Sequence, residues 1–390
     1  MNIILFTSAM IESEFASFQN EAIVKPNPSN QNFYARLIKA LSVNNRVIVV
    51  SHRPFVEGMT NEKVLPFKED SFRETKYFYT KVKYSKRYKL FEEEKEIIKT
   101  ARKAAELFRN NNYVVVVDTL RVNLLKAAIK FAKERKVKIV GMLTDNPANL
   151  SNVKKSYIKA INKNVLKLDG YLSLSNGLLV AMKVDEKPNY VFEGLVDEEI
   201  ATRKAPIGNY YFFGGALYER YGVKNLIHAF VDSSLKERLV IAGMGPLRQY
   251  IFDNMEKNPR ILYISQLPKE EIYGYEQNSI ANINPRPYYA KLDRESVPSK
   301  MIEYLASGVP TISTMHTKLY ELFKDEVFWI RDDSKMGIQK ALAEFEKEDK
   351  KIWHEKATNA KKKVYELYGV RPQGERISYF LETLNSSLNR

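Results

Sequence analysis

The sequence predicts an α/β protein with two consecutive doubly wound domains. Short apolar runs, typical of buried parallel strands, alternate with amphipathic helical patterns, and this alternation pauses at the polar stretch Asp197–Gly208 and then restarts. The chain has 390 residues, more than one hydrophobic core usually supports. Because alternating strands and helices fold into parallel sheets covered by helices, we expect two such sheets, one in each half of the chain.

The first half supplies six apolar runs that suit buried strands. They are Ile3–Phe6, Val47–Val50, Tyr113–Val117, Val137–Leu143, Tyr171–Leu174 and Tyr190–Phe192. Clear helical patterns lie between them, at Phe33–Leu41, Glu93–Phe108 and Val122–Glu134. We predict a first domain over residues 1–196.

The second half repeats the alternation after the linker, which contains Pro206 and few apolar residues. Its expected strands are Tyr210–Phe213, Leu239–Ala242, Ile261–Ile264, Ala281–Asn284, Val309–Ser313 and Val327–Ile330. Its expected helices are Val223–Val231, Leu247–Met255, Lys269–Gln277 and Lys335–Phe345, followed by Lys351–Tyr368 and Pro372–Leu388. We predict a second domain over residues 197–370, with ligands at the carboxyl ends of the strands.

Composition narrows the classes of function. The chain has 62 Lys and Arg against 47 Asp and Glu, a formal charge of +15 that favours anionic partners such as phosphorylated ligands, acidic membranes or nucleic acid. It contains no cysteine, which excludes disulfides and thiol chemistry, and no two of its four histidines have a metal-ligand spacing.

No apolar run approaches the ~20 residues that cross a bilayer. Met1 leads directly into a strand, so we expect a cytoplasmic protein.

Two glutamates, Glu295 and Glu303, flank the start of a predicted helix in the sequence ESVPSKMIE. A loop ends near Pro298, a helix follows and ends at Gly308, and Val309–Ser313 continues as a strand. Helix N-termini bind phosphate, and carboxylates bind sugar hydroxyls. One short segment therefore has groups for a diphosphate and two polyols, which together describe a nucleotide sugar. The alternative is an exposed helix with two incidental acids.

This segment resembles the donor-binding motif of the retaining, family-4-like glycosyltransferases of GT-B fold, in a branch of bacterial polysaccharide glycosyltransferases that carries Pro-Ser-Lys at Pro298, Ser299 and Lys300. The resemblance implies that Glu295 contacts the donor sugar and acts in catalysis, and that Glu303 holds the ribose. It also implies two Rossmann-like domains with a cleft between them, and a C-terminal helix, part of residues 370–390, that packs back on the first domain.

Further donor contacts are expected in the loops that follow the second-domain strands. Glycines there let a backbone approach a phosphate, although a plain tight turn would use them equally. The family's usual diphosphate clamp is an arginine and a lysine at positions occupied here by Ala216 and Tyr221, which leaves Arg220, Lys224 and Lys300 as the nearest substitutes. The predicted donor-binding residues in these loops are Gly215, Arg220, Gly243, Gly245, Leu267 and Arg286.

The first domain is expected to bind the acceptor. Asp118 and Asp145 follow predicted strands, where the family shows acceptor- or sugar-contacting residues, and we list both with Glu295 as candidate catalytic residues. Helix capping is the commoner use of aspartate at such positions. The family's histidine is absent from both places, so the leaving phosphate oxygen is expected to take the acceptor proton.

The stretch Lys68–Lys89 contains eight Lys or Arg and six Phe or Tyr. This mixture suits an anionic membrane surface, a solvated mobile loop or, least of all, nucleic acid.

The resemblance implies a hexosyl- or N-acetylhexosaminyl-transferase. It would move a sugar from a nucleotide-sugar donor, with UDP expected, to a glycan or polyprenyl-linked acceptor in bacterial capsule or surface polysaccharide biosynthesis. No cofactor and no metal is expected, because cations and N–H groups can neutralise the diphosphate. We expect a monomer or homodimer that does not bind nucleic acid, with peripheral contact at the inner face of the plasma membrane. Alternatives are a nucleotide-sugar 2-epimerase and a non-catalytic GT-B subunit that binds a glycosylated partner.

Overall fold

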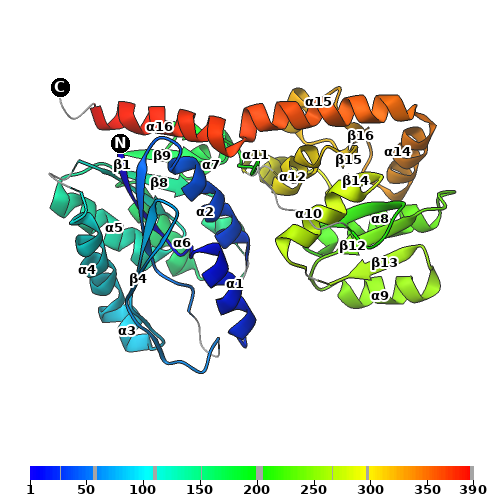
Figure 1. Ribbon diagram of the computed structural model, residues 1–390. Coiled ribbons are helices and arrows are strands. Elements are labelled where there is room, and N and C mark those ends of the chain that lie inside the picture. Colours follow the sequence, from blue (N-terminus) through cyan, green and yellow to red (C-terminus); the bar gives the residue numbers. More distant parts are fainter. Residues whose placement is uncertain are drawn as a thin grey trace. The chain divides into compact units, whose positions relative to one another are not determined.

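The protein is described by a computed structural model (Figure 1), which covers residues 1–26, 28–55, 59–108, 112–150, 152–198, 205–265, 267–295 and 298–386. It divides into two compact units. The first comprises Met1–Leu195, Arg294–Val297 and Val370–Arg390, and the second comprises Val196–Asp293 and Pro298–Gly369. Within the described ranges, every helix is too short or too polar to cross a bilayer.

The first unit is built on an eight-stranded sheet in the order β10-β9-β8-β7-β1-β2-β5-β4. All neighbours are parallel except β4 and β5. The strands are β1 (Asn2–Thr7), β2 (Arg46–Ser51), β4 (Lys68–Phe72), β5 (Thr75–Tyr79), β7 (Val114–Asp118), β8 (Ile139–Leu143), β9 (Gly170–Ser173) and β10 (Asn189–Val191). A separate antiparallel pair joins β3 (Val64–Leu65) to β6 (Val82–Lys83).

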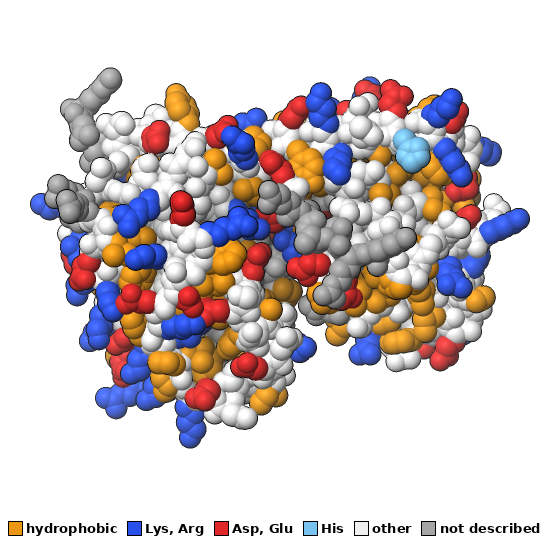
Figure 2. Space-filling view, viewed as in Figure 1, with side chains coloured by type: hydrophobic (Ala, Val, Ile, Leu, Met, Phe, Trp, Pro, Cys, Tyr) orange, Lys and Arg blue, Asp and Glu red, His pale blue; other side chains and the backbone are white. Residues whose placement is uncertain are grey.

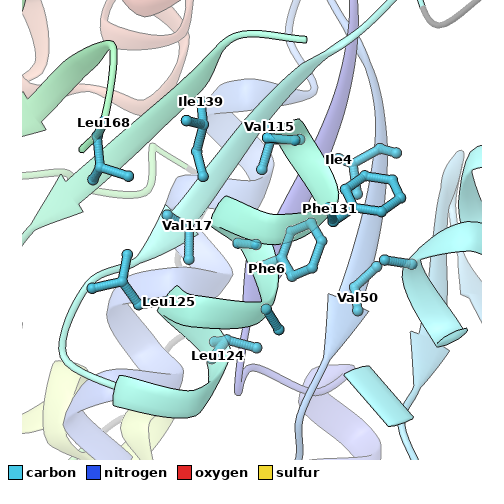
Figure 3. Packing of buried hydrophobic residues seen from close by; sticks show 14 of the residues in the cluster. Ile4, Phe6, Val50, Val115, Val117, Leu124, Leu125, Phe131, Ile139 and Leu168 are labelled. Atoms are coloured by element: carbon cyan, nitrogen blue, oxygen red, sulfur yellow. The ribbon is translucent and has the colours of Figure 1, made fainter. Parts of the chain in front are cut away.

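Helices cover both faces of this sheet because successive strand residues point to opposite sides. Ile4 and Phe6 of β1 join one cluster, drawn in Figure 3, and Ile3 and Leu5 join another on the opposite face. The first face carries α4 (Glu93–Ala105), α5 (Val122–Arg135), α6 (Lys155–Val165) and α7 (Asn176–Ala181), and the second carries α1 (Glu12–Glu21), α2 (Pro28–Leu41) and α16 (Val370–Ser386). The last helix thus packs on the unit that contains the first strand (Figure 1).

The second unit has a six-stranded, wholly parallel sheet in the order β13-β12-β11-β14-β15-β16. Its strands are β11 (Tyr210–Gly214), β12 (Arg238–Ala242), β13 (Ile261–Ile264), β14 (Ala281–Asn284), β15 (Thr311–Thr314) and β16 (Phe328–Ile330). Its helices are α8 (Val223–Val231), α9 (Arg248–Lys257), α10 (Lys269–Asn278), α12 (Ser299–Ser307), α13 (Thr317–Leu322), α14 (Lys335–Lys347) and α15 (Lys350–Tyr368). A further helix, α11 (Ala290–Glu295), spans the boundary between the units.

The stretch Lys68–Lys89 is not a loop. It forms β4, β5, β6 and most of α3 (Lys86–Phe91). Three of its aromatic side chains, Tyr77, Phe78 and Tyr79, are buried in the sheet, so they are not available to a membrane.

Candidate active site

In each unit the strand order reverses beside the first strand of the sheet. In the second unit β12 and β13 lie on one side of β11, and β14, β15 and β16 lie on the other. Ligands of doubly wound sheets bind at the carboxyl ends of the strands at such a switch point. The loops that follow β11 and β14 and the helix α12 therefore form the candidate donor site.

Two of the predicted phosphate-binding glycines have a structural reason to be glycine. Gly243 has φ +138°, and a Cβ there would lie 1.9 Å from the carbonyl oxygen of Gly215. A Cβ on Gly245 would lie 2.4 Å from the carbonyl oxygen of Leu217. These contacts pack the loop after β12 against the loop after β11, whose backbones are joined by a 2.9 Å hydrogen bond from Leu217 N to the oxygen of Met244.

Gly215 differs from both. A Cβ there would meet its nearest atom, a Phe213 ring carbon, at 3.4 Å, an ordinary van der Waals distance. Its φ is not positive. Nothing in the described protein therefore requires glycine at this position. Its N–H donates a 3.0 Å hydrogen bond to the Ala242 carbonyl oxygen, so what is open beside the carboxyl end of β11 is the space next to its Cα.

The helix α12 begins and ends where the sequence predicts. Pro298 is its N-cap residue and no described side chain caps the helix, while Met301 N donates a 2.9 Å hydrogen bond to the Pro298 carbonyl oxygen. The N–H groups of Ser299 and Lys300 are the first-turn donors that an acceptor can use. Gly308 ends the helix with φ +75°. The Tyr304 hydroxyl holds α12 beside the donor loop, since it lies 2.8 Å from the nitrogen and 3.2 Å from the oxygen of Gly214.

Lys300 lies between two carboxylates. Its Nζ is 2.9 Å from Glu303 and 3.3 Å from Glu276, whose side chain is buried. Burial lowers the pKa of the Lys300 ammonium, but Glu303 and Glu276 raise it by more, so its pKa lies above the ordinary value and the group stays charged. The sequence analysis did not identify Glu276, because no sequence pattern distinguishes its position on α10.

The remaining predicted donor residues have mixed environments. The exposed Arg220 guanidinium lies 5.2 Å from the ring centroids of both Tyr218 and Tyr221. Lys224 pairs with Glu219 at 3.0 Å. Leu267 packs against the apolar cluster under α10 and α12.

Arg286 follows β14 and pairs with the buried Asp293 at 3.1 Å. This ion pair gives the arginine a structural partner within the second unit.

In the first unit the switch point lies between β1 and β7. Asp118, at the end of β7, is fully buried, and its Oδ1 accepts a hydrogen bond from Leu120 N at 3.0 Å. Asn30 connects the ends of β1 and β7, because it lies 3.0 Å from the hydroxyl of Ser8, the residue after β1, and 3.4 Å from Asp118 Oδ2. Burial raises the pKa of Asp118, with Arg121 acting in the opposite direction.

Asp145 follows β8 in the loop before the short helix Pro147–Asn149. The residue is exposed, but desolvation of its carboxyl by the surrounding protein raises the pKa of Asp145 to about 6, with a hydrogen bond from Thr144 lowering the pKa and the charge of Asp118 raising it. Neither aspartate is a helix N-cap, since Asn146 caps the short helix and Arg121 precedes α5.

Glu295 is buried at the end of α11 and contacts the same loop of the first unit. Its Oε2 accepts hydrogen bonds from Asn146 at 3.0 Å and from Asn149 at 2.7 Å. The structure therefore brings Glu295 to the residues beside Asp145. It groups Glu295 with the first unit and Glu303 with the second.

A buried histidine near this edge was not considered in the sequence analysis. His52 follows β2, and its ring nitrogens lie 2.8 Å from Thr80 Oγ1 and 2.6 Å from Glu93 Oε1. Burial raises the pKa of Glu93, but the hydrogen bond and charge of His52 lower it more, so the carboxylate is favoured. The available signal was the position of His52 directly after a buried strand.

Two doubly wound units with polar side chains at the carboxyl ends of their strands define a two-domain α/β protein of GT-B fold. Residues 198–366, which make up most of the second unit, match the family model described as Glycosyl transferases group 1. No curated protein matches the sequence.

Solved structures of the same fold match nearly the whole chain. A sucrose-phosphate synthase from Thermosynechococcus elongatus has 12% identity and a TM-score of 0.69, with 99% of this chain and 100% of that chain covered. An α,α-trehalose-phosphate synthase (UDP-forming) from Burkholderia xenovorans, in complex with glucose-6-phosphate, has 12% identity and a TM-score of 0.69, with 98% and 99% covered. Anabaena HepE in complex with UDP has 11% identity and a TM-score of 0.65, with 98% and 100% covered. The expected GT-B fold is confirmed, and the fold and the domain match support a glycosyltransferase.

Proposed function

We propose that the protein is a retaining glycosyltransferase that moves a sugar from a nucleoside diphosphate donor, a UDP-sugar, to a glycan or lipid-linked acceptor of bacterial surface polysaccharide biosynthesis. The observation that carries the proposal is the N-terminus of α12, which no described side chain caps, on a helix that Tyr304 holds against Gly214 at the end of β11. Helix N–H groups and close backbone suit a diphosphate. The UDP in the HepE complex and the UDP-forming synthase support the choice of base.

The second unit supplies the donor contacts. Ser299 and Lys300 present first-turn N–H groups to the diphosphate, and Glu303, oriented by Lys300 at 2.9 Å, holds the ribose hydroxyls. Lys300 is already paired with two carboxylates, so its main role is to position Glu303. Neutralisation of the leaving group then depends on helix N–H groups and on Arg220, and no metal is needed.

In the reaction, the bond from the anomeric carbon to the diphosphate oxygen breaks and a bond to the acceptor oxygen forms on the same face. The acceptor proton passes to the leaving diphosphate oxygen. Glu295, held by Asn146 and Asn149, orients the donor sugar hydroxyls. Asp145, whose pKa is about 6, is ionised at neutral pH and accepts a hydrogen bond from the acceptor. Asp118 is buried at the end of β7, on the same edge of the sheet.

Substitution of the two glutamates tests the assignment. Glu295→Ala should lower kcat by several hundredfold, a loss of ~3–4 kcal/mol of transition-state stabilisation, with UDP affinity kept. Glu303→Ala should instead weaken UDP binding measured by calorimetry. Full turnover in Glu295→Ala would remove the central role of this residue.

Product stereochemistry and the requirement for an acceptor separate the alternatives. NMR of the product should show the donor's anomeric configuration, and an inverted linkage would contradict retention. An epimerase would convert the donor without any acceptor. Ala216 and Tyr221, where a cationic clamp is usual, favour a non-catalytic subunit as the second candidate, and such a protein should not bind UDP.

A further inference from the structure

The helix α3 exposes apolar side chains that the core does not use. Its N-cap Ser85 accepts a hydrogen bond from Tyr88 N at 3.0 Å, and the Tyr88 side chain is buried, which anchors the helix. At its other end Leu90 and Phe91 are each 66% exposed, and Tyr84 before the helix is 38% exposed. Two adjacent bulky side chains at this exposure are costly in water and typical of an interaction site.

Cations surround these apolar side chains. Lys83, Lys86, Arg87 and Lys89 are exposed, and Lys89 Nζ lies 5.1 Å from the ring centroid of Tyr84. Across the part of the chain that the structure describes, none of the four forms an ion pair with a carboxylate, although the exposed Glu92 follows Phe91. Figure 2 shows hydrophobic side chains together with Lys and Arg, and some Asp and Glu, at the lower end of the first unit, where Figure 1 places α3. We call this set, with Tyr84, Leu90 and Phe91, the α3 surface.

The α3 surface lies at the same edge of the first sheet as the proposed acceptor residues. Asn123, in the first turn of α5, donates a hydrogen bond to the carbonyl oxygen of Lys89 at 3.0 Å. The α5 helix follows directly on the loop that begins at Asp118. The end of α3 is therefore fixed to the element that follows the candidate catalytic aspartate.

We propose that the α3 surface docks the first unit on an anionic lipid bilayer. Leu90 and Phe91 enter the interface between headgroups and acyl chains, and the four cations meet anionic headgroups. The apolar pair distinguishes this partner from a soluble polyanion, which would leave Leu90 and Phe91 in water. The docking goes beyond the transfer reaction and does not depend on it, but it would bring the acceptor edge to a membrane.

Vesicle sedimentation tests the proposal on the full chain. The wild type should bind phosphatidylglycerol-containing vesicles and leave phosphatidylcholine vesicles largely unbound. Lys86→Glu combined with Arg87→Glu should weaken binding by at least ~25-fold, since each cation near an anionic leaflet contributes roughly fivefold. Leu90→Ser combined with Phe91→Ser should also weaken it. Equal binding to both vesicle types, or full binding by the serine variant, would overturn the proposal.

A second basic surface supplies the matched control. Lys159 and Lys163 border a groove of about 520 Å³ between α6 and α7 of the same unit. Lys159→Glu combined with Lys163→Glu makes the same change in net charge and should keep most vesicle binding. If it loses as much as Lys86→Glu with Arg87→Glu, membrane contact is not specific to α3.

A direct readout of insertion comes from Phe91→Trp, which keeps the surface apolar. Its added emission should shift to the blue with anionic vesicles and be quenched by brominated acyl chains. An unshifted spectrum would contradict insertion. UDP affinity and thermal unfolding of every variant should match the wild type, so a failure of membrane docking is distinguishable from a failure of the donor site.

Discussion

Replacing Gly215 with alanine adds one methyl group at the carboxyl end of β11. The nearest protein atom would be a Phe213 ring carbon at 3.4 Å, and φ is not positive. The free energy of unfolding should therefore change by no more than ~0.5 kcal/mol, or rise slightly because alanine restricts the unfolded chain. If a diphosphate approaches this backbone, the methyl group occupies its space, and UDP affinity should fall at least tenfold, about 1.4 kcal/mol.

Gly243→Ala provides the contrast. Its methyl group would lie 1.9 Å from the Gly215 carbonyl oxygen, at φ +138°. One of the two loops must move, so we expect a loss of ~3 kcal/mol or more in stability. Urea unfolding and UDP calorimetry on both variants separate the effects. A Gly215→Ala protein that binds UDP as well as the wild type would refute the placement of the diphosphate at this loop.

Two further predictions concern charges at the site. In the folded protein the pKa of Asp145 is raised from its ordinary value of 3.8 to about 6, so its ionisation lowers the free energy of unfolding as pH rises from about 4 to 6. Asp145→Asn should remove this penalty, a gain of ~1 kcal/mol at pH 8 after allowance for solvent screening and none below pH 4, as measured by urea unfolding. Lys300→Met should cost ~2 kcal/mol at pH 7, because it removes a cation that neutralises the buried Glu276. Adding Glu276→Gln should restore much of that loss, and no restoration would contradict the pairing.

The sequence predicted those parts of the site that depend on local signals. Pro298 and Gly308 mark the limits of α12 because proline and glycine act on their own backbone. The amide partners of Glu295 lie 146 and 149 positions away in the chain, and no local pattern identifies them. The packing reason for Gly243 is likewise a contact with a distant loop.

The hairpin of β4 and β5 was missed for a related reason. The β4 sequence KEDSF is mostly exposed at the sheet edge, so it lacks the alternation that marks a half-buried strand. The aromatic residues that follow were interpreted with the cations around them, whereas three of them are buried on β5. Sequence composition does not report which side chains are exposed. Because these three aromatic side chains are buried, the membrane proposal rests on α3 instead.

The placement of α16 bears on how the chain folds during synthesis. Ile377, Leu381 and Leu384 complete the same hydrophobic cluster as Ile3 and Leu5. Although α1 and α2 cover the same face of the first sheet, the part that α16 covers stays exposed until residues 370–386 have emerged from the ribosome. A first unit that matures before the second one is synthesised would lack α16, so its nascent chain should need chaperone protection until this helix has emerged.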